Sequence, residues 1–248
     1  MAKDEVMTTK TTAAVATVAP VQVDIAKEDM MVPFLKVIQS LSEEVTPGKD
    51  KYNPDVRPGD IYDSVTRTVF KDAKAVICGL KKYYAEWTPE VRGQLVGKHA
   101  ANSDIVKNAV KVEKTTDKGN PYFTLQTKTG NDLIETYGVV MIIKNGDGLT
   151  LPAVLTLSKT SFMVGKQLTT VLAIHQSKGT PVFKLSTTTT SNTKGSWFKP
   201  AFAFDSYETD ADVLAMASGM VPLTDAILYG NTSSDEGSVT VAVDDDLL

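Results

Sequence analysis

From Gly59 to Phe204 the chain consists of short segments rich in Val, Ile, Thr and aromatic residues, and turn sequences separate them. This pattern restricts the fold more than any other feature, because segments of this length and composition are typical of β-strands. DKGNP, TGND and NGDG stand between segments, where hairpin connections are expected. A mainly β fold is therefore predicted. Its strands are expected within residues 59–70, 73–89, 121–130, 133–144, 149–158, 180–190 and 196–204.

One helix interrupts the strands, at residues 158–176. Its apolar residues recur at the spacing of one helical face, and Ser158 or Thr160 is expected to cap its first turn. The order of several strands, one helix and two further strands predicts an OB-fold-like five-stranded barrel, with the helix between strands 3 and 4. Extra hairpins would occupy residues 92–145, and a β-sandwich with one crossover helix is the alternative. The apolar stripe comprises Val164, Leu168, Val171 and Leu172.

Short flanking helices are expected on both sides of the barrel. Residues 31–45 place Phe34, Leu35, Ile38 and Leu41 on one helical face. Pro33 suits the first turn of such a helix. Residues 46–60, with three prolines and two glycines, form a turn-rich connection. A second, acidic helix is predicted in residues 205–222, where Leu214 and Met216 or Ala217 would pack on the body. The proposed division is a flexible arm (1–24), a single domain (25–230) and a disordered acidic tail (231–248).

Charge is distributed unevenly along the chain. Residues 61–204 carry 19 Lys and Arg against 10 Asp and Glu, whereas residues 205–248 carry 10 acidic residues and no Lys or Arg. The formal net charge of -4 therefore hides a basic body and an acidic C-terminal part. Such asymmetry indicates nucleic-acid contact combined with an interaction tail.

Sequence signatures of catalysis and of cofactor binding are missing. Cys78 is the single cysteine, in an apolar setting that predicts a buried structural thiol, and His99 and His175 stand far apart without zinc-ligand spacing. Neither a phosphate-binding loop nor a dinucleotide-binding motif occurs. The chain is therefore expected to be neither an enzyme nor a cofactor or metal binder; a metal-dependent nuclease is the weakest alternative. Its carboxylates would come from Asp63, Glu86, Asp132 and Glu135.

Aromatic and basic residues occur together in three places, which is the combination that binds single-stranded nucleic acid. Taken alone, each aromatic residue is more simply explained as core or edge filler, because rings pack well on a pleated sheet. Phe202 and Phe204, which alternate with Ala, are assigned to the core. Three clusters in a basic body nevertheless favour a binding surface. The predicted contacts are Lys81, Lys82, Tyr83, Tyr84, Trp87, Arg92, Tyr122, Phe123, Lys128, Trp197 and Lys199.

The acidic tail can compete with nucleic acid for a cationic groove, since tethering gives it a high effective concentration there. Release by DNA would free the tail for partner proteins, and affinity would fall steeply with salt. The tail residues concerned are Asp235, Glu236, Asp244, Asp245, Asp246, Leu247 and Leu248.

In layout, size and its VDDDLL ending the chain resembles bacteriophage single-stranded DNA-binding proteins of the T7-like type, an OB-fold body with an acidic tail. VPFLKVIQSLSEEV, GDIYDSVT and YYAEW are also similar to the opening of a group of phage proteins considered single-stranded DNA binders. The resemblance implies roles for the tail acids and base stacking by Tyr83, Tyr84 and Trp87. The T7-like type ends in phenylalanine; Leu248 stands there in this chain and cannot stack.

The resulting hypothesis is non-sequence-specific single-stranded DNA binding in phage replication or recombination, with replication or recombination proteins recruited through the tail. A virion structural or decoration protein is the alternative, because an all-β body with Thr-rich strands suits it equally. No apolar run of about 18 residues and no signal-peptide order is apparent, so the host cytoplasm is the expected location and no membrane partner is expected. Whether the chain forms a homodimer is left open.

Overall fold

A computed structural model describes most of the chain between residues 32 and 230. Arg92, the predicted arm (1–24) and the acidic tail (231–248) lie outside the described residues, so the predictions that concern them stay predictions. The described ranges are 32–90, 93–115, 119, 121–146, 148–192 and 195–230.

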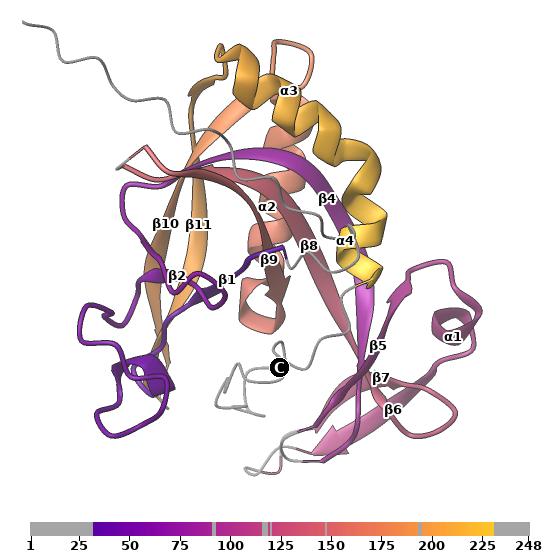
Figure 1. The fold of residues 1–248 in the computed structure, drawn as a ribbon. Helices are drawn as coiled ribbons and strands as arrows, with labels where there is room; N and C mark the ends of the chain where they lie inside the picture. Colours follow the sequence, from indigo (N-terminus) through magenta and orange to yellow (C-terminus); the bar gives the residue numbers. More distant parts are fainter. Residues whose placement is uncertain are drawn as a thin grey trace, which may run out of the picture. The chain divides into compact units, whose positions relative to one another are not determined.

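Eleven strands join in one curled, mixed sheet, in which the order along the main path is β11-β10-β4-β8-β9-β1-β2-β3 (Figure 1). β1 and β9 pair in parallel, and the other pairs are antiparallel. The mainly β prediction is confirmed, but the sheet is much larger than a plain five-stranded barrel. The strands are β1 (Phe34–Val37), β2 (Ile61–Asp63), β3 (Val69–Phe70), β4 (Lys74–Trp87), β5 (Leu95–Ala100), β6 (Val110–Thr115), β7 (Pro121–Gln126), β8 (Asp132–Lys144), β9 (Thr150–Ser158), β10 (Pro181–Asn192) and β11 (Gly195–Tyr207).

The long strand β4 connects two parts of the sheet. One of its edges pairs with β8 along almost the whole strand; its other edge pairs with β10 at residues 74–76 and with β5 at residues 83–87. A register shift between Ile77 and Gly79 adds one residue to β4. Such a bulge increases the local twist of the strand.

The far ends of β4 and β8 continue into a smaller region that we call the lobe: residues 95–126 with the adjoining strand ends. β5 lies beside β4 there, β7 beside β8 and β6 beside β7 (Figure 1). The short helix α1 (Asp104–Lys107) connects β5 to β6, and the Ser103 hydroxyl accepts a bond from the N–H of Val106. The extra hairpins predicted for residues 92–145 are thus confirmed as strands of the same sheet.

The inner face of the curled sheet packs on helix α2 (Phe162–His175). The predicted helix is confirmed, because Val164 and Leu168 are buried against Met141, Leu157 and the rest of the inner core. The predicted caps are wrong: Ser161 holds the N-cap position and makes no side-chain cap bond, because the 3-10 helix η3 (Lys159–Ser161) leads into α2.

The outer face of the sheet is covered by α3 (Ala211–Met220), the 3-10 helix η4 (Val221–Leu223) and α4 (Thr224–Gly230) (Figure 1). Ala217 is buried there, as predicted, whereas Met216 is 40% exposed. By length and composition alone, Ala211–Tyr229 would be apolar enough to cross a membrane, a test that a helix packed on a core also passes.

The predicted helix at residues 31–45 is wrong. Strand β1 occupies its first half, and only the 3-10 helix η2 (Glu43–Val45) is helical. Backbone pairing of β1 with β2 and β9 outweighs the helical spacing, which cannot be distinguished from a short strand over so few residues. Ile38 is buried, but Leu41 is 75% exposed, so the supposed apolar face does not exist.

Candidate nucleic-acid interface

The predicted contacts on β4 separate onto two faces. Lys81 and Tyr83 point to the outer face under α4, and Lys82 and Tyr84 point to the inner face, because side chains alternate along a strand. The ring of Tyr83 is 1% exposed and makes an edge contact with Tyr229, with centroids 6.0 Å apart. Tyr84 is 8% exposed. Neither ring offers a face to a base in this conformation, so the stacking role predicted for them is not supported.

Acidic residues of the C-terminal part hold lysines of the body. Lys81 forms an ion pair with Asp225 on α4. Lys144 pairs with Glu208 at 2.9 Å; although partial burial opposes ionisation, this ammonium keeps the pKa of Glu208 below its usual value. Lys74 similarly pairs with Asp205 at 2.7 Å. Some acidic residues that precede the tail thus pair with body lysines within folded elements.

A group of cations and rings lies where the inner face of the sheet meets the start of α2; we call Lys82, Tyr84, Glu135, Phe162 and Lys166 the Phe162 cluster. The Nζ atoms of Lys82 and Lys166 lie 5.9 and 5.1 Å from the Phe162 ring centroid, and Lys82 Nζ also lies 5.6 Å from that of Tyr84. Glu135 accepts a hydrogen bond from the Tyr84 hydroxyl at 2.7 Å and forms an ion pair with Lys82. The Lys82 and Glu135 side chains remain 37% and 40% exposed, so solutes can reach them.

The ionisation of this cluster follows from these contacts. Partial burial opposes charge on Glu135, but the hydrogen bonds from Lys82 and Tyr84 and the charge of Lys166 hold the pKa of that carboxyl below its ordinary value. The bond to Glu135 raises the pKa of Lys82. Burial, followed by the nearby carboxylate, raises the pKa of the Tyr84 hydroxyl. The ammonium and the carboxylate are therefore both charged at neutral pH.

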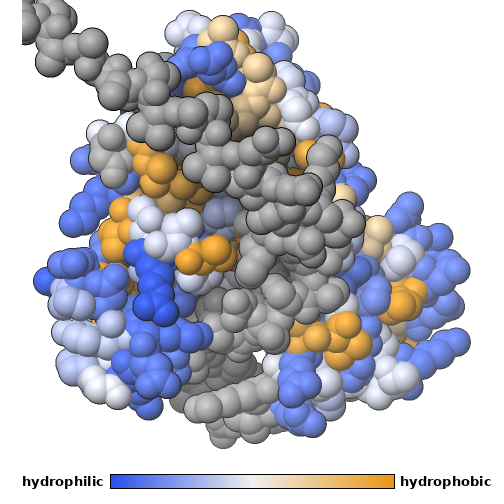
Figure 2. Space-filling model, viewed as in Figure 1, coloured by the Kyte–Doolittle hydropathy of each residue, from blue (hydrophilic) through white to orange (hydrophobic). Residues whose placement is uncertain are grey.

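The lobe carries a second cation over a ring. Lys111 Nζ on β6 lies 4.2 Å from the ring centroid of Phe123 on β7, and Phe123 is 54% exposed. Tyr122 is half-buried, and Lys128 is exposed in the turn before β8. The lysine lies over the Phe123 ring, and the exposure of Phe123 leaves part of the ring accessible to solutes. Figure 2 shows that the surface on this side is mostly hydrophilic, with separate hydrophobic patches over the lobe.

Trp87 lies at the junction between β4 and the lobe and is half-buried. Its register partner on β8 is Asp132, whose carboxylate accepts bonds from Lys114 at 2.7 and 2.9 Å. Nearby, Lys98 Nζ lies 5.5 Å from the Phe34 ring centroid. Of the rings predicted on β4, Trp87 alone is half-buried rather than buried.

The remaining carboxylates considered as metal ligands have other partners. Glu86 is 7% exposed; it lies 2.6 Å from His99 Nε2 and accepts a bond from Asn131 at 2.7 Å. Asp63 accepts bonds from the turn at Val65 and Thr66. Across the part of the chain that the structure describes, His, Cys, Asp and Glu form no group that could hold a metal ion.

Cys78, predicted to be a buried structural thiol, is only partly buried. It packs between the outer-face clusters under α3 and α4. Burial raises the pKa of its thiol to about 11, so the thiol stays protonated at neutral pH.

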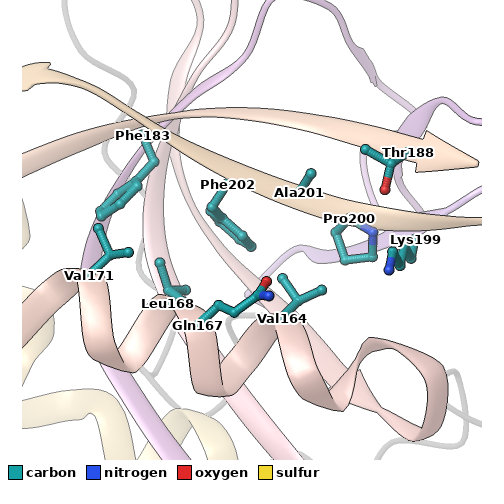
Figure 3. A pocket seen from close by; sticks show the side chains of 10 residues that line it. All are labelled: Val164, Gln167, Leu168, Val171, Phe183, Thr188, Lys199, Pro200, Ala201 and Phe202. Carbon is teal, nitrogen blue, oxygen red and sulfur yellow. The ribbon is translucent and has the colours of Figure 1, made fainter.

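Trp197 and Lys199 are half-buried near the start of β11. A pocket of about 260 Å³ separates β10 and β11 from α2, and Lys199 and Gln167 line it beside apolar side chains. Figure 3 shows Val164, Leu168 and Val171 pointing from α2 toward the two strands. Lys199 and Trp197 belong to the region of the β10–β11 turn, far in sequence from the lobe.

Phe204 is not the core residue that its alternation with Ala predicted. It is 40% exposed and stacks on His175 at the end of α2, with centroids 4.0 Å apart and planes at 18°. Tyr207 completes the group, since its hydroxyl lies 2.8 Å from His175 Nδ1. Phe202 is partly buried against the inner core, as expected.

Sequence reasoning did not identify Phe162, Lys166 or Lys111 as site residues. Phe162 and Lys166 stand four residues apart, a spacing that brings side chains together on a helix. The helix prediction alone could therefore have paired them. Their contact with Lys82 depends on how α2 crosses the sheet, which no local pattern reveals.

Comparison with known proteins adds one finding. No curated protein and no solved structure matched the chain. A family model described as Pam3 phage gp34-like protein matches residues 13–225. This match covers nearly all the described elements, from β1 into α4. The chain therefore belongs to the Pam3 phage gp34-like protein family.

Proposed function

We propose that this protein binds single-stranded DNA without sequence specificity, in phage replication or recombination. The observation that carries the proposal is the order of its five long strands. β4, β8, β9, β10 and β11 occur in this order along the chain, with the lobe strands β5–β7 between the first two and α2 between the third and the fourth. In the sheet they lie in the order β11-β10-β4-β8-β9. This arrangement supports an OB-like core, to which β1–β3 and the lobe are additions.

OB-folds bind oligonucleotides on the face of their second and third strands and with the loops that follow their first and fourth strands. In this chain the first of those connections is the lobe, which carries Phe123 and Lys111 and begins beside Trp87. The second is the β10–β11 turn, which is followed by Trp197 and Lys199. Part of the predicted aromatic–basic set therefore lies on the two connections that an OB-like binder would use: Phe123 is exposed on the first, and Trp197 and Lys199 are half-buried after the second. The accessible Lys81 and Lys82 lie on β4 itself.

In the proposed mechanism, cations neutralise phosphates and accessible rings stack on bases, each stacked base contributing about 1–3 kcal/mol. The acidic residues of the tail compete for the same cations and, once displaced, recruit replication or recombination proteins. Asp225, Glu208 and Asp205 already form ion pairs with body lysines. Acidic residues that precede the tail therefore hold some of these cations in the folded protein in the way proposed for the tail.

The test is a titration of Trp87 and Trp197 fluorescence with oligo(dT) at two salt concentrations. Stacked indoles lose emission, and the apparent association constant should fall with salt by about 0.7 logarithmic units per phosphate contact for each tenfold increase. A variant lacking residues 235–248 should bind more tightly. Unchanged fluorescence and unchanged mobility of the oligonucleotide at low salt would rule the proposal out.

A virion structural or decoration protein is the second candidate. Exposed apolar side chains on the lobe favour it, since Val96, Ile105 and Val110 are each more than two-fifths exposed and suit contact with another protein. A protein with this role would co-sediment with phage particles and would not respond to oligo(dT).

A further inference from the structure

We infer that the Phe162 cluster is a phosphate subsite in which Glu135 takes, in the free protein, the place of a strand phosphate. The inference rests on the proposed function and adds a regulated contact to it. It differs from the lobe and the β10–β11 turn in that it lies on the inner face of the sheet, beside the first turn of α2.

The geometry around Glu135 is that of an anion site already filled by a carboxylate. Lys82 and Tyr84 both direct their polar hydrogens to Glu135 Oε1, and Lys166 adds its charge from α2. An ammonium, a hydroxyl and a second ammonium form a donor set that a phosphate satisfies equally well, since its oxygens accept the same charge-assisted bonds.

The Phe162 ring contacts both cationic donors of the cluster. Each ammonium group lies within 6 Å of the ring centroid, and the electron-rich ring face attracts a cation. Tyr137 packs against the same ring, with centroids 5.0 Å apart. The ring therefore gives both cations a contact that does not depend on Glu135.

Glu135 is able to turn away. Its side chain is 40% exposed and can reach water when a phosphate replaces it, so exchange does not bury an unpaired carboxylate. A strand that enters the subsite must displace this carboxylate first, which weakens binding and makes release fast. Glu135 therefore limits how tightly this subsite holds a phosphate.

The experiment compares oligo(dT) binding by the full chain and by Glu135→Gln, with fluorescence anisotropy as the readout. The amide oxygen of the variant still accepts the Tyr84 hydroxyl bond, but no longer holds Lys82 by charge. We expect binding to tighten about three- to tenfold and the logarithmic salt dependence to steepen by about 0.7, the amount for one more phosphate contact on a single strand. Lys82→Met should have the opposite effect on both quantities.

Asp50→Asn is the matched control, because it removes one negative charge from an exposed side chain in the connection between η2 and β2, outside the lobe, β11 and the Phe162 cluster. If Glu135→Gln tightens binding no more than this control does, the inference is overturned while the proposed function stands. If the unmodified chain does not bind oligo(dT), both are overturned. If inorganic phosphate, at the ionic strength of a chloride control, raises the Tm of Glu135→Gln as much as oligo(dT) does, the site serves free phosphate and the inference is also overturned.

Discussion

The side-chain amide of Gln39 pairs with both backbone groups of Phe198, as a neighbouring strand would. Its Nε2 donates to the Phe198 carbonyl oxygen, and its Oε1 accepts from the Phe198 N–H, both at 2.9 Å. β11 is the terminal strand of the main path, so this amide closes part of a sheet edge. Two residues further along the same edge, Pro200 has no N–H to offer, which also blocks pairing with another chain.

Gln39→Ala should lower the free energy of unfolding by about 1–3 kcal/mol, because it leaves two half-buried backbone groups without partners. Urea denaturation followed by circular dichroism measures this difference. Gln94→Ala, at an exposed position before β5, is the control and should change stability by less than about 0.5 kcal/mol. Equal effects of the two variants would contradict the edge-closing role.

Gly165→Ala should destabilise the protein although alanine is the better helix former. A Cβ at this position would lie 2.4 Å from a Tyr137 ring atom, so α2 would have to move off the sheet at a cost of about 1–3 kcal/mol. Gly219→Ala on α3 has no atom within 4 Å of the new Cβ and should stabilise the protein by up to about 1 kcal/mol. Thermal unfolding of the two variants should therefore shift in opposite directions.

Tyr83→Ala and Phe123→Ala should separate core rings from surface rings. Removing the buried ring should cost about 3–5 kcal/mol of stability. Removing the exposed ring should leave the Tm within a few degrees of the unmodified value and weaken oligo(dT) binding by the amount of one stacked base, about 1–3 kcal/mol. Val110→Ala, which truncates an equally exposed apolar side chain on the neighbouring strand, should leave binding unchanged.

The pair of Glu208 with Lys144 should make stability depend on pH. The folded state lowers the pKa of Glu208, so the pair stabilises the protein fully above the ordinary pKa of a glutamate, about 4.3, and this contribution is lost as the pH falls through the lower folded value. Glu208→Gln should therefore be less stable by about 1 kcal/mol near neutral pH and should converge with the unmodified protein once the pH falls below the lowered folded pKa of Glu208. A constant difference at all pH values would show that packing, rather than charge, matters there.

Strand and helix content was predictable from the sequence because each long element satisfies a local rule. β4, β8 and β9 have the composition of strands between turn residues, and the apolar stripe of α2 continues over more than two turns. Residues 31–45 were predicted wrongly, because the spacing of Phe34 and Ile38 fits a short strand as well as a helix. The pairing of β1 with β9 also joins segments more than 100 residues apart, so no local pattern reveals it. Only tertiary structure distinguishes the two.

The candidate site was predictable in composition but not in position. LKKYYAEW contains the aromatic and basic residues expected of such a site, yet α4 covers one face of this segment. Only the fold shows that Tyr83 lies beneath this helix, which begins about 140 residues further along the chain. In contrast, exposure of Phe123 follows from its place on an outer hairpin of the lobe. The sequence showed the charge asymmetry between the body and the C-terminal part. It did not show that Lys81 forms an ion pair with Asp225.

β4 and β8 pass without a break from the barrel-like half of the sheet into the lobe. Because the two strands stay hydrogen-bonded to each other along this length, bending the lobe relative to the rest of the sheet would disrupt pairs of their ladder. If the protein binds single-stranded DNA as proposed, a strand that contacts both the lobe and β11 would bridge two places joined by this paired segment. The number of nucleotides covered should then vary little from one sequence to the next.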